Sequence, residues 1–210
     1  MLQYKVVDES TLDLLNKIND CHLFEQYRLV GGTALALIHG HRKSIDLDFF
    51  GLEKIDTYEM VQFFKSIGEV RELRSSRKID SLFLNNVKID VVNYPYPWID
   101  GILKDEKIRI ASSKEIAAMK IAAITNRGSK KDFYDLNKLL EMYSLSQIIG
   151  FYSEKFIDSS VFFALKSIIY FDDADDQEEP IMFDPVTWEL VKANIIKAHL
   201  DFIRNSSLIN

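Results

Sequence analysis

Two aspartates that alternate with apolar residues are the most chemically suggestive feature of this 210-residue sequence. Asp46 and Asp48 lie in the run Ile-Asp-Leu-Asp-Phe-Phe, whose alternation predicts a half-buried strand with both carboxylates on one side. Two adjacent carboxylates repel each other unless a cation lies between them. Oxygen ligands of this kind suit Mg²⁺ bridged to substrate phosphates. The pair therefore predicts a metal site, and the alternative is a solvated strand face.

A glycine pair follows the predicted strand 27–30. Gly31 and Gly32 would let backbone N–H groups approach a phosphate closely, because glycine has no side chain there. A helix opening at Thr33 would direct its positive end to the same place. The Thr33 hydroxyl would cap that helix or donate to a phosphate oxygen. The alternative is an ordinary turn from strand to helix.

A third carboxylate, Asp90, lies in the apolar run Val-Lys-Ile-Asp-Val-Val. A carboxylate on such a strand is costly to bury without a metal or strong hydrogen bonds. Asp90 is therefore either a further metal ligand or a structural partner of an arginine.

A second group of charges lies in a predicted helical region. Lys120 and Arg127 are seven residues apart and share a face if their helix is continuous. Asp132 and Asp135 are three apart and also share a face. A glycine-serine pair after Arg127 would break the helix. The alternatives are a solvent-facing lysine, a helix-capping role for Asp132 and a structural role for Asp135.

The surrounding periodicities predict an α+β protein with a mixed β-sheet, flanking helices and a C-terminal helical bundle. Strands are expected at 27–30, 45–50, 70–75, 81–84, 87–93 and 107–111. Helices are expected at 11–27, 33–39 and 57–67, from 113 onward, and at 131–142, 156–171 and 185–204. The predicted boundary falls near Ser112, giving an α/β domain over 1–112 and a helical domain over 113–210.

Composition excludes several classes of protein. A single cysteine excludes an internal disulfide. The absence of an apolar run long enough for a signal or a membrane span predicts a cytoplasmic protein without membrane contact. The net charge of −6 argues against generic coating of nucleic acid but allows a local basic groove. Six of the acidic residues lie in 172–179, which we expect to be a solvated, disordered loop.

Two further runs have both a structural and a functional interpretation. Arg71, Arg74, Arg77 and Lys78 form a basic run, either a solvated hairpin or a clamp on RNA phosphates. Strict alternation would place positions 71 and 77 on one face and 74 on the other. The run Tyr-Pro-Tyr-Pro-Trp at 94–98 would pack a loop or offer a stacking surface for a base.

Taken in order, the motifs resemble a known family. Gly-Gly-Thr, then the Asp-x-Asp of Asp46 and Asp48, then a lone aspartate on a later strand are similar to the DNA polymerase β-like nucleotidyltransferase superfamily. Arg42 to Asp48 together with the later blocks resemble its AbiEii/AbiGii-toxin type; those blocks are Lys120 followed by Arg127, and Lys-Asp-Phe-Tyr-Asp-Leu at 131–136. The resemblance covers about 27–140.

This resemblance implies transfer of a nucleoside monophosphate from an NTP, dependent on Mg²⁺ or Mn²⁺, with RNA (a tRNA end) as the expected acceptor. It also implies a cognate antitoxin, as in type IV toxin–antitoxin or abortive-infection systems. The implied metal ligands are Asp46, Asp48 and Asp90. The implied nucleotide-binding residues are Gly31, Gly32, Thr33, Arg42, Ser44, Lys120 and Arg127. Catalytic roles are implied for the three metal ligands, for Lys120 beside the triphosphate, and for Asp132, which is an alternative to Asp90 as the third essential carboxylate.

Other classes of function stay open at this point. A silent module of the same fold would hold a nucleotide or a protein partner, with the apolar positions Phe162, Phe163 and Trp188 serving an interface. A small-molecule nucleotidyltransferase would use the same two aspartates. A glycosyltransferase would also use Asp-x-Asp with a metal, but it leaves the glycine pair and the Lys120 block unexplained. The sequence leaves the oligomeric state open.

Overall fold

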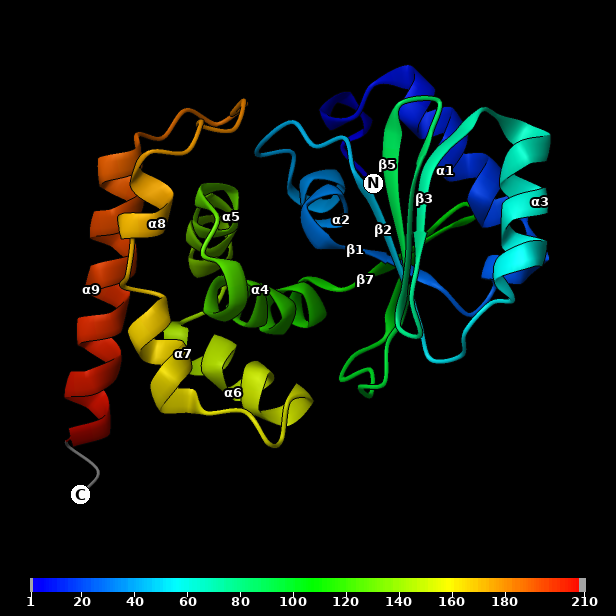
Figure 1. Ribbon diagram of the computed structural model, residues 1–210. Coiled ribbons are helices and arrows are strands. Elements are labelled where there is room, and N and C mark those ends of the chain that lie inside the picture. Colours follow the sequence, from blue (N-terminus) through cyan, green and yellow to red (C-terminus); the bar gives the residue numbers. More distant parts are fainter. Residues whose placement is uncertain (1, 208–210) are drawn as a thin grey trace. The chain divides into compact units, whose positions relative to one another are not determined.

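The computed structural model describes residues 2–207 (Figure 1). The chain divides between Ser112 and Ser113 into two compact units, an α/β unit and a helical unit. Within 2–207, no helix is both long enough and apolar enough to cross a bilayer. The fold class agrees with the sequence prediction of a mixed sheet, flanking helices and C-terminal helices.

The α/β unit is built on a mixed sheet in the order β3-β4-β5-β2-β1-β7-β6. β2 is parallel to β5 and β1 is parallel to β7, whereas the other neighbours are antiparallel. The strands are β1 (Arg28–Val30), β2 (Leu47–Gly51), β3 (Val70–Ser75), β4 (Ile79–Leu84), β5 (Val87–Asn93), β6 (Ile102–Asp105) and β7 (Ile108–Ala111). β6 is absent from the sequence prediction, because its run of four residues is too short and too polar to give a periodic signal.

Helices cover the two faces of this sheet unequally. In Figure 1, α1 (Glu9–Asp20) and α3 (Thr57–Ile67) lie on one side and α2 (Gly31–His39) on the other. The short 3₁₀ segments Tyr4–Val6 and His22–Phe24 complete the unit. Phe24 is fully buried, and its ring contacts those of Phe49, Phe63 and Phe64 at 5.5–6.0 Å. This packing defines a closed face of the sheet under α1 and α3.

The other side of β4, β5 and β2, which we call the open face, is only partly covered. Along these strands fully buried residues such as Leu82, Ile89 and Phe49 alternate with half-exposed ones. The half-exposed residues on the open face are Ser81, Phe83, Lys88, Asp90, Val92, Asp48 and Phe50. The charged side chains of Asp48, Lys88 and Asp90 therefore lie on the face of the sheet that α1 and α3 do not cover.

The helical unit contains α4 (Ser113–Arg127), α5 (Lys130–Leu140), α6 (Leu145–Lys155), α7 (Val161–Ser167), α8 (Asp172–Asp175) and α9 (Trp188–Ser207). The predicted helix over 156–171 is too long, because only α7 within it is helical. Phe156 ends α6, which starts at a capping box between Ser144 and Gln147, and the next helix begins only after Ser160. The serine signals were present in the sequence, but a continuous apolar pattern concealed the break between the two helices.

The acidic segment 172–179 is ordered, which corrects the expectation of a disordered loop. Ala174 is buried, and the Asp175 carboxylate accepts hydrogen bonds from Trp188 Nε1 at 2.6 Å and Lys192 Nζ at 3.0 Å. The Gln177 side chain accepts from the backbone N–H of Lys130 at 2.9 Å. These contacts fasten the segment to α5 and α9, since partners distant in sequence supply the donors.

A β-bulge in β3 changes which residues reach the open face. Arg71 is opposite Phe83 and Arg74 is opposite Ser81, so two residues of β3 lie opposite one residue of β4. Glu72 takes up the extra length with φ 51°. Arg71 and Arg74 therefore lie on the same face, contrary to the prediction from strict alternation. Arg77 lies in the turn between β3 and β4.

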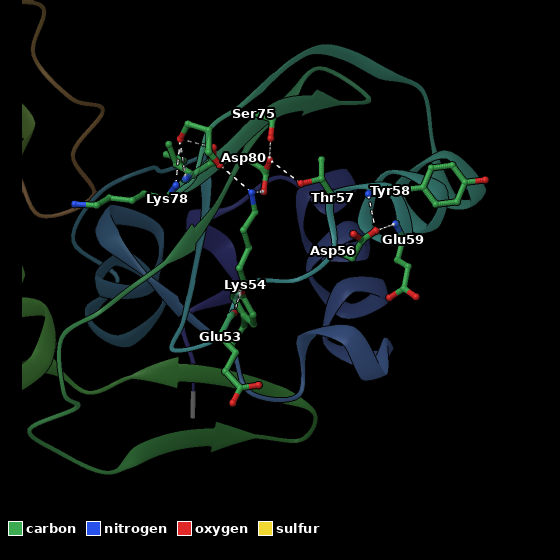
Figure 2. Close-up of polar contacts among 12 residues, drawn as sticks. Glu53, Lys54, Asp56, Thr57, Tyr58, Glu59, Ser75, Lys78 and Asp80 are labelled. Carbon is green, nitrogen blue, oxygen red and sulfur yellow. Dashed lines mark hydrogen bonds and ion pairs between the residues drawn. The ribbon is translucent and has the colours of Figure 1, made fainter.

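A buried carboxylate fixes β3 beyond the bulge (Figure 2). Asp80 is 2% exposed on the closed face, and it accepts hydrogen bonds from the hydroxyls of Ser75 and Thr57. Lys54 Nζ lies 3.7 Å from its second oxygen. Because Ser75 is directed to Asp80 on the closed face, its neighbour Arg74 is directed to the open face.

Replacing Asp80 with alanine should lower the free energy of unfolding by about 2 kcal/mol, because the two hydroxyls lose a buried acceptor. Urea denaturation followed by circular dichroism measures the change. The control is Asp13→Ala, which removes an exposed carboxylate paired with Lys17 and should cost less than about 1 kcal/mol. Equal losses in the two variants would contradict the anchoring role of Asp80.

Candidate functional site

The first element of the site is the contact between Gly31 and Asp48. β1 ends at Val30, which pairs with Asp48 on β2, and α2 begins at the next residue. Gly31 has φ +71°, and a Cβ built on it would lie 2.3 Å from the Oδ2 atom of Asp48. The carboxylate thus packs against the backbone at the start of the helix. Any side chain at position 31 would displace it, so the glycine is required on two grounds.

Gly32 makes the corresponding contact with an arginine. A Cβ at this position would lie 2.2 Å from Nη2 of Arg42, whose side chain comes from the loop after α2 and is 4% exposed. The Ser44 hydroxyl lies 3.4 Å from the same point. A guanidinium beside the first turn of a helix reinforces the positive end of the helix dipole. The two groups together attract an anion such as a phosphate.

Thr33 joins the helix to the strand that carries the aspartates. Its hydroxyl donates to the backbone carbonyl of Asp46 at 2.5 Å and lies 2.8 Å from the Ser44 hydroxyl. Thr33 is 1% exposed, so its side chain serves the loop rather than solvent. The structure therefore brings the glycine pair, Thr33, Arg42, Ser44 and Asp48 together at one end of α2, and Asp46 joins them through its backbone carbonyl.

Asp90 adjoins this group through the sheet register. It is the direct partner of Asp48 on the parallel strand β5. Its Oδ1 accepts from the Ser81 hydroxyl at 2.5 Å, and its Oδ2 lies 2.6 Å from Lys88 Nζ. Burial alone would lower the pKa of Lys88, but the ion pair with Asp90 and the charges of Asp48 and Asp46 raise it.

Lys88 and Ser81 are absent from the sequence-based set of site residues. The sequence could have identified Lys88, because it precedes Asp90 by two residues on a predicted strand and so shares its face. The sequence could not have identified Ser81, because its position beside Asp90 depends on the register of β4 against β5.

The donor set fits a divalent cation of the Mg²⁺ type. Mg²⁺ is commonly held by one or two carboxylates together with water and substrate phosphates. Within residues 2–207, no three His, Cys, Asp or Glu side chains lie close enough to hold a metal by themselves. Asp48 packs against the helix end that attracts phosphates, and Asp46 lies two residues before it, so the chain offers two carboxylates for such an arrangement.

A second charged cluster lies within the helical unit. Lys120 Nζ is 2.8 Å from Asp132 Oδ1 and 2.5 Å from Asp135 Oδ2, with all three side chains 5% exposed or less. Arg127 Nε lies 2.8 Å from the other oxygen of Asp132. The helix breaks at Gly128, and Ser129 rather than Asp132 occupies the cap position of α5. The predicted pairs thus meet at one point, with Lys120 between the two aspartates.

The ionisation of Asp132 follows from these partners. Burial alone would raise the pKa of Asp132, but the charge of Lys120 and the bonds from Arg127 and Lys120 outweigh it, and the pKa lies far below its usual range. Asp132 is therefore ionised at every physiological pH.

Comparison with known sequences identifies a family. The sequence model described as "Nucleotidyl transferase AbiEii toxin, Type IV TA system" matches residues 13–201. The uncharacterized protein aq_aa25 of Aquifex aeolicus is 33% identical over 171 residues, which cover 79% of this chain and 83% of that protein.

Solved structures show the same fold at low sequence identity. A putative nucleotidyltransferase from H. pylori has a TM-score of 0.61 at 17% identity, covering 100% of this chain and 99% of that one. MenT4, a nucleotidyltransferase toxin from Mycobacterium tuberculosis, has a TM-score of 0.54 at 15% identity, covering 90% and 81%. At these identities the likeness concerns the fold.

Replacing Lys120 with methionine should lower the free energy of unfolding by about 3–5 kcal/mol, because two buried carboxylates lose their shared ammonium. Chemical denaturation at pH 7 measures the loss. The matched control on α5 is Lys138→Met, which breaks surface pairs with Glu141 and Asp184 and should cost under about 1 kcal/mol. A loss no larger than that of the control would refute the cluster's structural importance.

Acid titration tests the charge state of Asp132. Its folded pKa is depressed below the ordinary 3.8, so its stabilising contribution is complete above that value and is lost as the pH falls toward the folded pKa. Asp132→Asn should therefore give a shallower decline of stability below about pH 4 than wild type. Asp184→Asn, at an exposed carboxylate, should keep the wild-type slope. Identical slopes for Asp132→Asn and wild type would disprove the assignment.

Proposed function

Because this chain belongs to the AbiEii family of nucleotidyltransferase toxins, we propose that it transfers a nucleoside monophosphate from an NTP to RNA in a Mg²⁺-dependent reaction. A tRNA end is the acceptor we favour. A cytoplasmic setting and a cognate antitoxin are further parts of this proposal. They follow from the toxin family rather than from any contact in the structure.

The observation that carries the proposal is the close packing at the start of α2. Gly31 and Gly32 place Asp48 and Arg42 against the same turn of backbone, so the Asp48 carboxylate adjoins a phosphate-attracting helix end, and Asp46 lies two residues before it. A triphosphate needs both features, since its oxygens require donors and its charge requires neutralisation. We assign the β and γ phosphates to the first turn of α2 and to Arg42.

The reaction forms a bond between the α-phosphorus and an acceptor hydroxyl oxygen and breaks the bond to the bridging oxygen of the leaving pyrophosphate. Mg²⁺ held by Asp46 and Asp48 would supply charge neutralisation at the phosphates. The residues of the chain contribute positioning and electrostatic stabilisation. Asp90 is our candidate for taking the hydroxyl proton, because it is the direct partner of Asp48 in the sheet register.

For the helical unit, we propose that Lys120, Arg127 and Asp132 support the same reaction, as the family motifs imply. Lys120 is engaged by two carboxylates, which favours a role in holding Asp132 over direct neutralisation of the triphosphate. Arg127 is the accessible cation of the cluster at 58% exposure, which suits it better for contact with a nucleotide.

Transfer of label from α-³²P-NTPs to bulk tRNA tests the proposal. Asp46→Asn and Asp48→Asn should each lower the transfer rate by at least about 10²–10³-fold, because each variant loses a carboxylate that would hold the neutralising Mg²⁺. Chelation of divalent metal with EDTA should abolish transfer by the wild type. The rates follow from gel electrophoresis of the labelled RNA.

The control is Asp13→Asn, which removes one surface carboxylate on α1 and should keep the wild-type rate. Each variant is first compared with wild type by circular dichroism, so that unfolding is distinguished from loss of chemistry. Wild-type rates in both site variants would exclude these aspartates as metal ligands. Label in protein or in a small molecule instead of RNA would replace the proposed acceptor.

A further inference from the structure

Arg71 and Arg74 on the open face of the sheet take no part in the proposed chemistry, and Lys88 on the same face pairs with Asp90. We call Arg71, Arg74 and Lys88 the basic row. Arg71 is 58% exposed and Lys88 is 40% exposed at the side chain, and Arg74 is also exposed. All three lie on the same face as Asp48 and Asp90, because the extra residue of the β3 bulge turns Arg71 and Arg74 to the same side of the sheet.

The sheet register connects the basic row to the aspartates. Arg74 is opposite Ser81, Ser81 is opposite Asp90, and Asp90 is opposite Asp48, so one line of residues crosses four strands. A parallel line joins Arg71, Phe83 and Lys88. With strands about 4.8 Å apart, the Arg74 backbone lies about 10 Å from that of Asp90. The two lines start at β3, which is an edge of the sheet.

The charge around β3 contrasts with that of the whole chain. Residues 71–78 contain four cations and one acid, whereas the chain carries a net charge of −6. Arg71 is paired with Glu69 at 2.8 Å, and both side chains are more than half exposed. An exposed pair of this kind contributes little, so a phosphate can replace the Glu69 carboxylate.

We propose that the basic row binds the phosphate backbone of the RNA acceptor and directs its reactive end along the open face to Asp46 and Asp48. The inference rests on the proposed function and adds the surface that the acceptor occupies. Guanidinium groups bind phosphates in bidentate fashion, and they supply position without reading sequence. Phe83, half-exposed between Arg71 and Lys88 in the cross-strand line, adds an aromatic surface for a base.

Binding of fluorescently labelled bulk tRNA without NTP tests the proposal directly. Arg71→Ala/Arg74→Ala should raise the Kd about tenfold or more. It should also reduce the magnitude of the slope of log association constant against log salt concentration by about 1.4–1.8, corresponding to two lost phosphate contacts. The matched control is Lys17→Ala/Lys65→Ala, which removes two exposed cations from α1 and α3 on the opposite side of the sheet. The control should keep the wild-type slope.

A variant that is expected to tighten tRNA binding distinguishes the proposed contact from a general loss of folding. Glu69→Gln releases Arg71 from its carboxylate and should tighten tRNA binding at least twofold. Glu59→Gln, at an exposed position on α3, removes the same charge and should leave binding unchanged. A general effect of net charge would instead move both glutamine variants equally, and that result would overturn the proposal.

Transfer kinetics separate this inference from the proposed function. Loss of Arg71 and Arg74 should raise KM for tRNA while kcat and KM for NTP stay unchanged, because the row touches the acceptor alone. If the wild type labels tRNA and the double variant keeps the wild-type salt slope, the basic row is refuted and the function stands. If the wild type transfers nucleotide but neither binds nor labels RNA, the proposed acceptor fails and the row fails with it.

Discussion

Like charges gathered at one end of a sheet are the constraint on which the α/β unit depends. Asp48 and Asp90 are direct partners on adjacent strands, and Asp46 lies just before the first of them. Carboxylates at this separation repel each other in the half-buried surroundings of a sheet face. The fold offsets that repulsion with the positive end of α2, the buried guanidinium of Arg42 and the ammonium of Lys88.

The same arrangement explains why the first turn of α2 carries glycines. The Asp48 carboxylate and the Arg42 guanidinium occupy the space that side chains at positions 31 and 32 would fill. The N–H groups of a helix's first turn have no partner within the helix, and here they adjoin both charges, which is a geometry suited to phosphates. The two faces of the sheet have different roles. The aromatic core around Phe24 packs on the closed face and stabilises the sheet, whereas the candidate site residues lie on the open face.

The charged residues of the helical unit form buried ion pairs, in contrast to the half-exposed carboxylates of the sheet. Lys120 lies between Asp132 and Asp135 with almost no exposure, and Lys155 pairs with Glu115 at 2.7 Å in a fully buried contact between α4 and α6. Buried pairs of this kind add little net stability but make the loss of either partner costly. They connect α4 to α5 and α4 to α6. Arg127 extends this network to the surface.

Much of this protein is determined by its sequence alone. The order of Gly-Gly-Thr, Asp-x-Asp and the Lys120 and Asp132 blocks indicated the family and the residues that meet at α2, because local spacing places them on known faces of strands and helices. Helix α3 and strands β3 and β5 have the predicted bounds, since their periodicity is uninterrupted.

The tertiary structure decided what depends on partners distant in sequence. It decided the common face of Arg71 and Arg74, the pairing of Lys88 and Ser81 with Asp90, the order in the acidic segment and the break before α7. A strand's register and a bulge are set by its neighbours in the sheet, and no single stretch of sequence contains that information.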